Sequence, residues 1–173
     1  MADPPGRPLV TVSFTAARDL DDAAADGVVL NVLMCRVPHA DRYVTGACTG
    51  GDAFIGRWLQ ANRPGAEHVV IVPANRRRAD PWWTAVTGPV TVIEMPPGST
   101  YADRNRRLVD EGTCLFGFPA HPEDDYRSRR SGTWQAIRMA MKAGKLSQWH
   151  CVTPPYEGRI VTAPGFLLPG RHR

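Results

Sequence analysis

The chain has 173 residues and a net charge of +4, with 43% hydrophobic and 22% charged residues. This length fits one domain of ordinary size, so we expect no second full domain. No apolar run approaches the roughly 20 residues of a membrane-spanning helix, so we expect a cytoplasmic globular protein with no membrane partner.

Strands and helices alternate along the chain after a Pro-rich stretch at residues 1–8, which we expect to be a flexible lead-in. Hydrophobic spacing predicts strands at 9–14, 41–45, 68–72, 90–95, 113–118 and 147–152. Helices are predicted from Asp52, over 101–110 and over 131–143, the last ended by Gly144. A Pro/Gly-rich tail, 154–173, holds one more candidate strand at 159–162.

One segment fits two structures. Asp21 or Asp22 can cap a helix that runs to about Cys35, but residues 28–33 also suit a strand. With either choice, the alternation predicts a single α/β domain over residues 9–153, with a mainly parallel sheet and helices on both faces. The four cysteines contain no Cys-x-x-Cys pair, and we expect reduced, structural thiols.

Three small-residue turns follow predicted strands. In an open α/β sheet, loops at the carboxyl ends of strands converge on one crevice, where ligands bind. The turns therefore predict a shared site, although Gly and Thr are also common in turns that only reverse the chain. The candidate ligand-binding residues in them are Thr15, Arg18, Thr45, Gly46, Gly50, Gly51, Asp52, Ser131, Gly132 and Thr133.

The turn before the helix at 131–143 is the strongest candidate for an anion site. Ser131, Gly132 and Thr133 bring unpaired backbone amides, hydroxyl groups and the positive end of the helix dipole together. This pattern predicts a phosphate pocket and a nucleotide-type small molecule as its ligand.

Asn105 is a polar residue on a helix face shared with Tyr101, Leu108 and Val109. A polar amide in that position needs partners, so Asn105 either holds neighbouring loops together or contacts the ligand. Its neighbour Arg104 either points along the crevice to bind phosphate or lies in solvent.

Two carboxylates are candidates for catalysis near the crevice. Asp52 follows the second turn, where it can also be a helix cap, and Glu94 stands at a strand end. Either could act as nucleophile or base in cleaving or transferring an N-glycosidic bond of a nucleotide. The sequence holds no metal-ligand spacing, Walker loop or Gly-x-Gly-x-x-Gly motif, so no cofactor is predicted.

Two arginine clusters allow two interpretations each. Residues 76–78, with Trp82 and Trp83, are either a stacking platform for single-stranded nucleic acid or a charged loop beside a core tryptophan. Arg127, Arg129 and Arg130 either close over a phosphate or balance the acidic residues 123–125 in a solvated turn.

Several short motifs, in this order, resemble the SLOG superfamily, a Rossmann-like group that includes DprA-type DNA-processing proteins, YspA/YpsA-related proteins and Lonely Guy phosphoribohydrolases. The resemblance runs from about Val10 to His150. Its motifs are Phe14-Thr15-Ala16-Ala17-Arg18, Thr45-Gly46-Ala47 to Gly50-Gly51-Asp52, Val72-Pro73-Ala74, Arg104-Asn105, Phe118-Pro119 and Ser131-Gly132-Thr133.

The resemblance implies a three-layer Rossmann-like domain, often a homodimer, with a nucleotide, nucleotide derivative or nucleic acid in the crevice. It adds Phe118 to the candidate ligand-binding residues. The phosphoribohydrolases carry Pro-Gly-Gly-x-Gly-Thr-x-x-Glu, but Ala136 stands here at the position of the catalytic glutamate. We therefore expect a nucleotide sensor or nucleotide-processing protein, with an N-glycosidase or transferase and DprA-like binding of single-stranded DNA as alternatives.

Overall fold

Seven strands form one sheet in the computed structural model, which describes residues 9–20, 25–85, 88–152 and 158–161. The strand order is β4-β3-β2-β1-β5-β6-β7, and all pairs are parallel except β6 with β7. The bounds are β1 (Thr11–Ala16), β2 (Arg42–Gly46), β3 (Glu67–Val72), β4 (Val90–Glu94), β5 (Cys114–Phe118), β6 (Leu146–His150) and β7 (Gly158–Val161).

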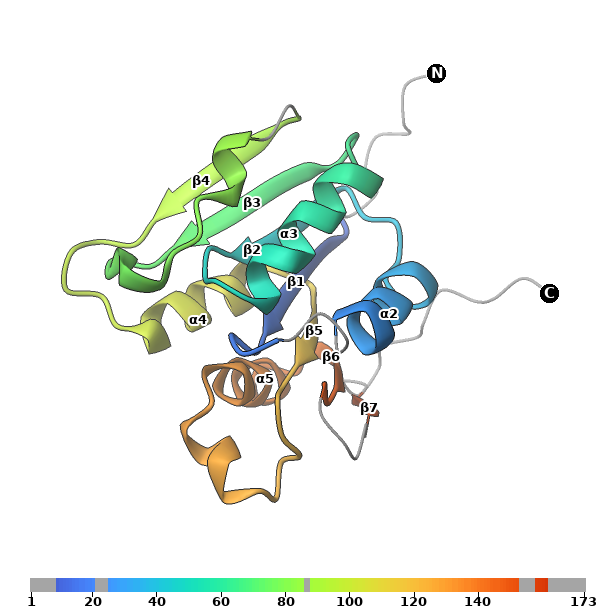
Figure 1. The fold of residues 1–173 in the computed structure, drawn as a ribbon, viewed down its shortest axis with the longest axis vertical. Helices are drawn as coiled ribbons and strands as arrows, with labels where there is room; N and C mark the ends of the chain where they lie inside the picture. Colours follow the sequence, from blue (N-terminus) through green and yellow to red (C-terminus); the bar gives the residue numbers. More distant parts are fainter. Residues whose placement is uncertain (1–8, 21–24, 86–87, 153–157, 162–173) are drawn as a thin grey trace.

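Helices cover both faces of the sheet (Figure 1). α2 (Leu30–Cys35) and α3 (Gly51–Asn62) pack on one face, and α4 (Tyr101–Glu111) and α5 (Gly132–Lys142) pack on the other. Side chains of β5 alternate between the two cores, with Phe116 on the α2/α3 side and Leu115 on the α4/α5 side. The predicted three-layer Rossmann-like domain is confirmed.

The predicted elements are present among the described residues, and the strand ends differ by at most two residues. The ambiguous segment at 28–33 is helical: a π-helical turn (Ala25–Val29) leads directly into α2. Asp21 and Asp22, the predicted caps, lie outside the described residues, as do residues 1–8 and most of the tail. None of the four cysteines is in a disulfide; three are buried and Cys35 is exposed.

The sheet topology fixes where a crevice can form. From β1 at the centre, the chain adds β2, β3 and β4 on one side, and α4 then carries it back to β5 on the other side of β1. The loops that follow β1 and β5 therefore leave the sheet toward opposite faces. Such a switch point leaves an opening at the carboxyl ends of the strands.

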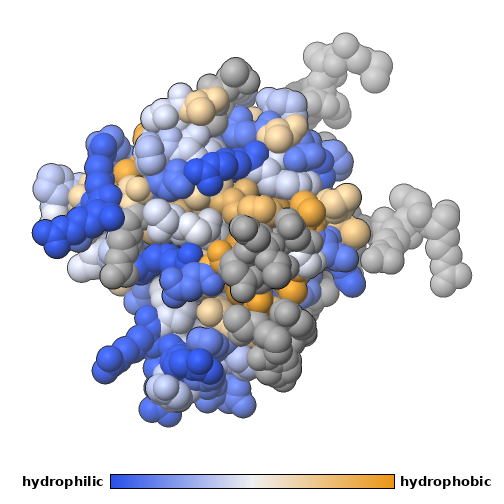
Figure 2. Space-filling view, in the orientation of Figure 1, coloured by the Kyte–Doolittle hydropathy of each residue, from blue (hydrophilic) through white to orange (hydrophobic). Residues whose placement is uncertain are grey.

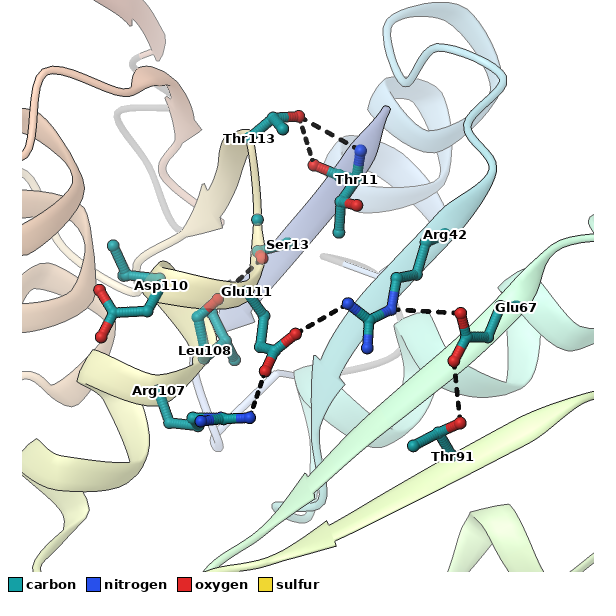
Figure 3. A network of polar contacts seen from close by, with 12 residues as sticks. Thr11, Ser13, Arg42, Glu67, Thr91, Arg107, Leu108, Asp110, Glu111 and Thr113 are labelled. Atoms are coloured by element: carbon teal, nitrogen blue, oxygen red, sulfur yellow. Dashed lines mark hydrogen bonds and ion pairs between the residues drawn. The ribbon is translucent and has the colours of Figure 1, made fainter. Parts of the chain in front are cut away.

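The amino ends of the strands are closed by paired polar groups (Figure 3). Arg42 Nη1 lies 2.8 Å from Glu111 Oε2, and Arg42 Nε lies 3.3 Å from Glu67 Oε2. Arg107 pairs with the second oxygen of Glu111 at 2.5 Å, and Glu67 accepts a hydrogen bond from Thr91. We call Arg42, Glu67, Arg107 and Glu111 the amino-end network.

Lys145, just before β6, closes the carboxyl end of α4. Its Nζ donates hydrogen bonds to the carbonyls of Val109, Asp110 and Gly112, at 2.5, 3.2 and 2.7 Å. A cation at this position satisfies carbonyls that have no partner within the helix and complements the helix dipole. No helix in the described part of the chain has the length and apolar character needed to cross a membrane.

Candidate functional site

A cavity of about 320 Å³ lies at the switch point and is lined by the loop after β1 and by residues at the starts of α3, α4 and α5. Figure 1 shows these helices around the carboxyl end of β1. Its lining brings together all three predicted turns. The lining residues are Thr15, Ala16, Ala17, Arg18, Asp19, Cys48, Asp52, Tyr101, Arg104, Asn105, Ala120, His121, Arg127, Ser128, Arg130, Ser131, Gly132 and Thr133.

A capping box sets the start of α4 and so the position of its inward-facing polar residues. Thr100 Oγ1 accepts a hydrogen bond from the Asp103 amide, and the Asp103 carboxylate accepts one from the Thr100 amide, at 2.8 Å. With the helix fixed in this register, Arg104 and Asn105 lie on its buried side and both line the cavity.

Arg104 and Asp52 form a buried ion pair on the cavity floor, and each residue is only 3% exposed. Arg104 Nη2 donates to Asp52 Oδ2, and the other carboxylate oxygen of Asp52 accepts from the Ala16 amide at 3.1 Å. Burial acts to lower the pKa of Arg104, but the Asp52 carboxylate, together with Cys48 and Tyr101, outweighs this effect and the pKa is raised. Arg104 therefore stays protonated. It is not exposed to solvent, and its charge is already paired with Asp52.

The prediction that Asp52 caps α3 is wrong. The residue before the helix is Gly50, and Asp52 lies in the first turn with its side chain directed to another element. Both carboxylate oxygens are engaged, one by a backbone amide and one by a guanidinium. A carboxylate held in this way is a poor nucleophile or base, so the structure gives no support to the predicted catalytic role.

Asn105 joins α4 to the start of α5. Its Nδ2 donates to the carbonyl of Gly132 at 3.0 Å and to Gln135 Oε1 at 3.1 Å, and its Oδ1 accepts from Arg104 Nη1 at 2.8 Å. The prediction that Asn105 holds neighbouring segments together is confirmed. Because it also lines the cavity, it links the floor of the cavity to the anion-favouring helix terminus.

The start of α5 presents free backbone donors to the cavity. Ser131 is the N-cap, and its Oγ accepts from the Trp134 amide at 3.3 Å. Among the described residues, the amides of Gly132 and Thr133 have no acceptor. These two amides and the helix dipole favour an anion in the cavity.

Four arginines line the cavity, and two of them are neutralised by the protein. Arg104 pairs with Asp52, and Arg127 pairs with Asp125, outside the cavity lining. Hydrogen bonds from Arg127 lower the pKa of Asp125 to about 2, so this pair persists over the physiological pH range. In the described part of the chain, Arg18 and Arg130 have no acidic partner.

The turn that holds Arg127, Arg129 and Arg130 has features of both predicted roles, a solvated turn and a group of arginines at the phosphate site. Arg127 balances an acidic residue, as in a solvated turn, whereas Arg130 lines the cavity beside α5. Arg129 is exposed and does not line the cavity. Figure 2 shows a mostly hydrophilic surface over the loop at residues 119–130, at the bottom of the view.

Other predicted ligand-binding residues lie outside the cavity. Phe118 is fully buried and stacks on His150, and Thr45 is 3% exposed within β2. Neither lines the cavity. The prediction that these two residues contact the ligand is therefore wrong: both are buried within the sheet.

The three glycines of the second turn have a structural role instead of a place in the lining. A Cβ on Gly46 would overlap the Arg104 guanidinium, and one on Gly51 would lie 2.7 Å from the Ala17 carbonyl oxygen. Gly50 has a positive φ of 77°, and a Cβ there would lie 1.8 Å from the Arg18 carbonyl oxygen. Gly50 and Gly51 are required because the loop after β1 packs directly against their backbone, and Gly46 leaves room for Arg104.

Glu94 lies at the end of the edge strand β4 and does not line the cavity. Its side chain is 64% exposed and pairs with Arg76. The prediction that Glu94 is near the crevice is wrong, because three strands separate β4 from β5 in the sheet order.

The predicted stacking platform at residues 76–83 contains one buried and one partly exposed tryptophan. Trp82 is 6% exposed and packs with Ala53 and Val70, and Trp83 meets its edge at 6.3 Å between ring centroids. Trp82 is therefore a core residue, as in the alternative of a charged loop beside a core tryptophan, whereas Trp83 is partly exposed.

Sequence reasoning missed Cys48, Tyr101, Asp19 and His121 as lining residues. Tyr101 could have been found, since it precedes Asn105 by one helical turn. Cys48 is 5% exposed, and Arg104 Nη2 lies 3.7 Å from its sulfur. Burial raises the pKa of this thiol, although Arg104 and Arg18 act against the shift, so it is not an activated nucleophile.

No family model, curated protein or solved structure matches the chain. The resemblance to the SLOG superfamily and the homodimer that it implies therefore stay predictions from short motifs. Within the described residues, no three His, Cys, Asp or Glu side chains are grouped so that they could hold a metal ion.

Proposed function

We propose that the cavity binds a nucleotide or nucleotide-derived ligand through a phosphate at the start of α5. The observation that carries this proposal is the pair of free amides, Gly132 and Thr133, beside the unneutralised Arg130. A helix N-terminus and a guanidinium are complementary to phosphate oxygens. The location supports the proposal, because ligands of open α/β sheets bind at the switch point.

The cavity is suited to a small molecule. Its volume of about 320 Å³ lies at the lower end of the range for ligand sites, and its walls come from four separate elements. Binding is favoured over catalysis, because Asp52 is held by two protein groups and Glu94 lies elsewhere. The burial of Trp82 likewise weakens the support for single-stranded DNA as the ligand.

A thermal-shift panel of nucleoside mono- and diphosphates tests the proposal. A ligand present at about 100 times its Kd stabilises the folded state by about 2.7 kcal/mol, which raises the Tm measurably. We expect at least one nucleotide to do so with the wild-type chain. A folded sample whose Tm no nucleotide raises would contradict the proposal.

Two substitutions at Gly132 localise the binding. Gly132→Glu places a carboxylate where the phosphate is proposed to lie, and an acidic residue in the first turn is compatible with the helix dipole. We expect this variant to fold and to lose the thermal shift. Gly132→Ala is the matched control: its Cβ would lie 3.5 Å from Asn105 Nδ2, an ordinary contact, so the shift should persist. A shift that persists in Gly132→Glu would place the ligand elsewhere.

A further inference from the structure

Positive charge reaches the cavity from two separate walls. Arg130 comes from the turn before α5, and Arg18 comes from the loop after β1. The other two cavity arginines, Arg104 and Arg127, already have carboxylate partners. The protein thus leaves one unneutralised guanidinium on each of two walls.

Arg18 is held in place without using its hydrogen-bond donors. Its guanidinium carbon lies 5.2 Å from the centre of the Tyr101 ring, a cation–π contact that orients the group. Its side-chain N–H groups have no acceptor among the described residues, and no ion pair joins it to Asp19 beside it. An oriented guanidinium with free donors is suited to bidentate contact with a phosphate.

The charge of Arg18 acts on the cavity floor. Burial raises the pKa of the Cys48 thiol, whereas Arg104 and, more weakly, Arg18 oppose this shift. Arg104 is neutralised by Asp52, so the net positive charge near Cys48 is that of Arg18. Arg18 and Arg130 belong to different segments that both line the cavity, the loop after β1 and the turn before α5.

We infer that the ligand carries two phosphate groups, one held by the start of α5 with Arg130 and the other by Arg18. This inference rests on the proposed function and narrows it to nucleotides such as a nucleoside diphosphate or bisphosphate. A nucleoside monophosphate would leave one guanidinium without an anion. A second charge-assisted phosphate contact should raise the affinity at least about tenfold.

Calorimetric titration of the full chain tests the inference. The ligands are AMP, ADP and adenosine 3′,5′-bisphosphate, the three guanosine counterparts, and inorganic pyrophosphate. We expect a two-phosphate nucleotide to bind at least about tenfold more tightly than the monophosphate with the same base. Tighter binding of the diphosphate than of the 3′,5′-bisphosphate would indicate adjacent phosphates, and the reverse order would indicate phosphates on separate carbons. Equal affinity of the mono- and two-phosphate nucleotides would overturn the inference and leave the proposed function standing.

Variants assign each phosphate to its arginine. Arg18→Gln should remove the advantage of the second phosphate and leave monophosphate affinity within about twofold, whereas Arg130→Gln should weaken both ligands. Arg18→Lys keeps the charge and should retain part of the advantage, which separates loss of charge from loss of packing on Tyr101. Arg129→Gln, an exposed neighbour outside the lining, should change neither affinity.

The outcomes separate the two proposals. If Arg18→Gln weakens the mono- and two-phosphate ligands equally, Arg18 does not hold a second phosphate and the inference fails. If pyrophosphate binds as tightly as the nucleotides, the two-phosphate inference is supported and the proposal of a nucleotide ligand is overturned. If no nucleotide and no pyrophosphate binds, both are overturned.

Discussion

At the amino ends of β2 and β3, two arginines and two glutamates pair with one another, whereas at the carboxyl ends of the strands four arginines and two aspartates line a cavity. The amino-end network is partly exposed and balanced in charge, and it closes that end of the sheet. The cavity holds an excess of cations, one of them in a fully buried ion pair. The balance of charge, more than the number of arginines, therefore distinguishes the candidate site from the scaffold.

The largest expected effect comes from breaking the buried ion pair of the cavity. Asp52→Asn leaves the Arg104 guanidinium without an anion at 3% exposure, and loss of one partner of a buried pair costs about 3–5 kcal/mol. We expect a fall of this size in the free energy of unfolding measured by urea denaturation. In the amino-end network, the matched change Glu111→Gln should cost about 1–2 kcal/mol, because this carboxylate and its partners are less buried. If Asp52→Asn and Glu111→Gln lowered the free energy of unfolding equally, the proposed difference between the two ends of the sheet would be contradicted.

A double substitution sharpens this result. Asp52→Asn combined with Arg104→Met removes both charges, and apolar replacement of a buried ion pair is often neutral or stabilising. We expect the double variant to be more stable than Asp52→Asn alone by about 2 kcal/mol or more in the same denaturation experiment. A double variant as unstable as the sum of its single changes would mean that packing, and not the stranded charge, accounts for the loss.

A change at the closed end should affect stability without affecting binding. Lys145→Met removes the Nζ that donates to three carbonyls at the end of α4, and we expect a cost of about 1–2 kcal/mol. The change in melting temperature produced by a bound nucleotide should stay the same as in the wild type. Loss of that shift would show that the two ends of the sheet are energetically coupled.

The smallest expected effect is a dependence of stability on pH. Burial lowers the pKa of His68 in the folded state, so the unfolded chain binds a proton more readily as the pH falls through about 6.5. Stability from this source is present above that pH and is lost on acidification. We expect the free energy of unfolding to decrease between pH 7.5 and 5.5, and His68→Asn to flatten the slope while lowering stability at every pH. An unchanged slope in the variant would assign the dependence to other groups, His150 among them.

The fold could be predicted because its determinants are local. Alternating strands and helices, a Thr-x-x-Asp start for α4 and a Ser start for α5 are visible in short windows of sequence. The inward position of Asn105 was also predictable, because helical spacing places it on the face of Leu108.

The rest of the site depends on contacts between distant segments. Asp52 and Arg104 are 52 residues apart in the chain, and local preference for an acidic residue at a helix start indicated a cap instead. Glu94 was misplaced because a strand-end position does not reveal whether the strand is central or at the edge. The balance of charge among the arginines likewise becomes visible only when Asp125 and Asp52 are seen with their partners.

The close packing of Gly50 on the Arg18 carbonyl has a consequence for the thermodynamics of binding. Gly51 donates its amide to the carbonyl of Ala17 at 3.0 Å, so this part of the loop after β1 is attached to α3 before any ligand arrives. A receptor that is already ordered loses little conformational entropy on association. The contacts made by Arg18 should therefore appear almost undiminished in the affinity, and a side chain at Gly50 would weaken binding by loosening the loop, without touching the ligand.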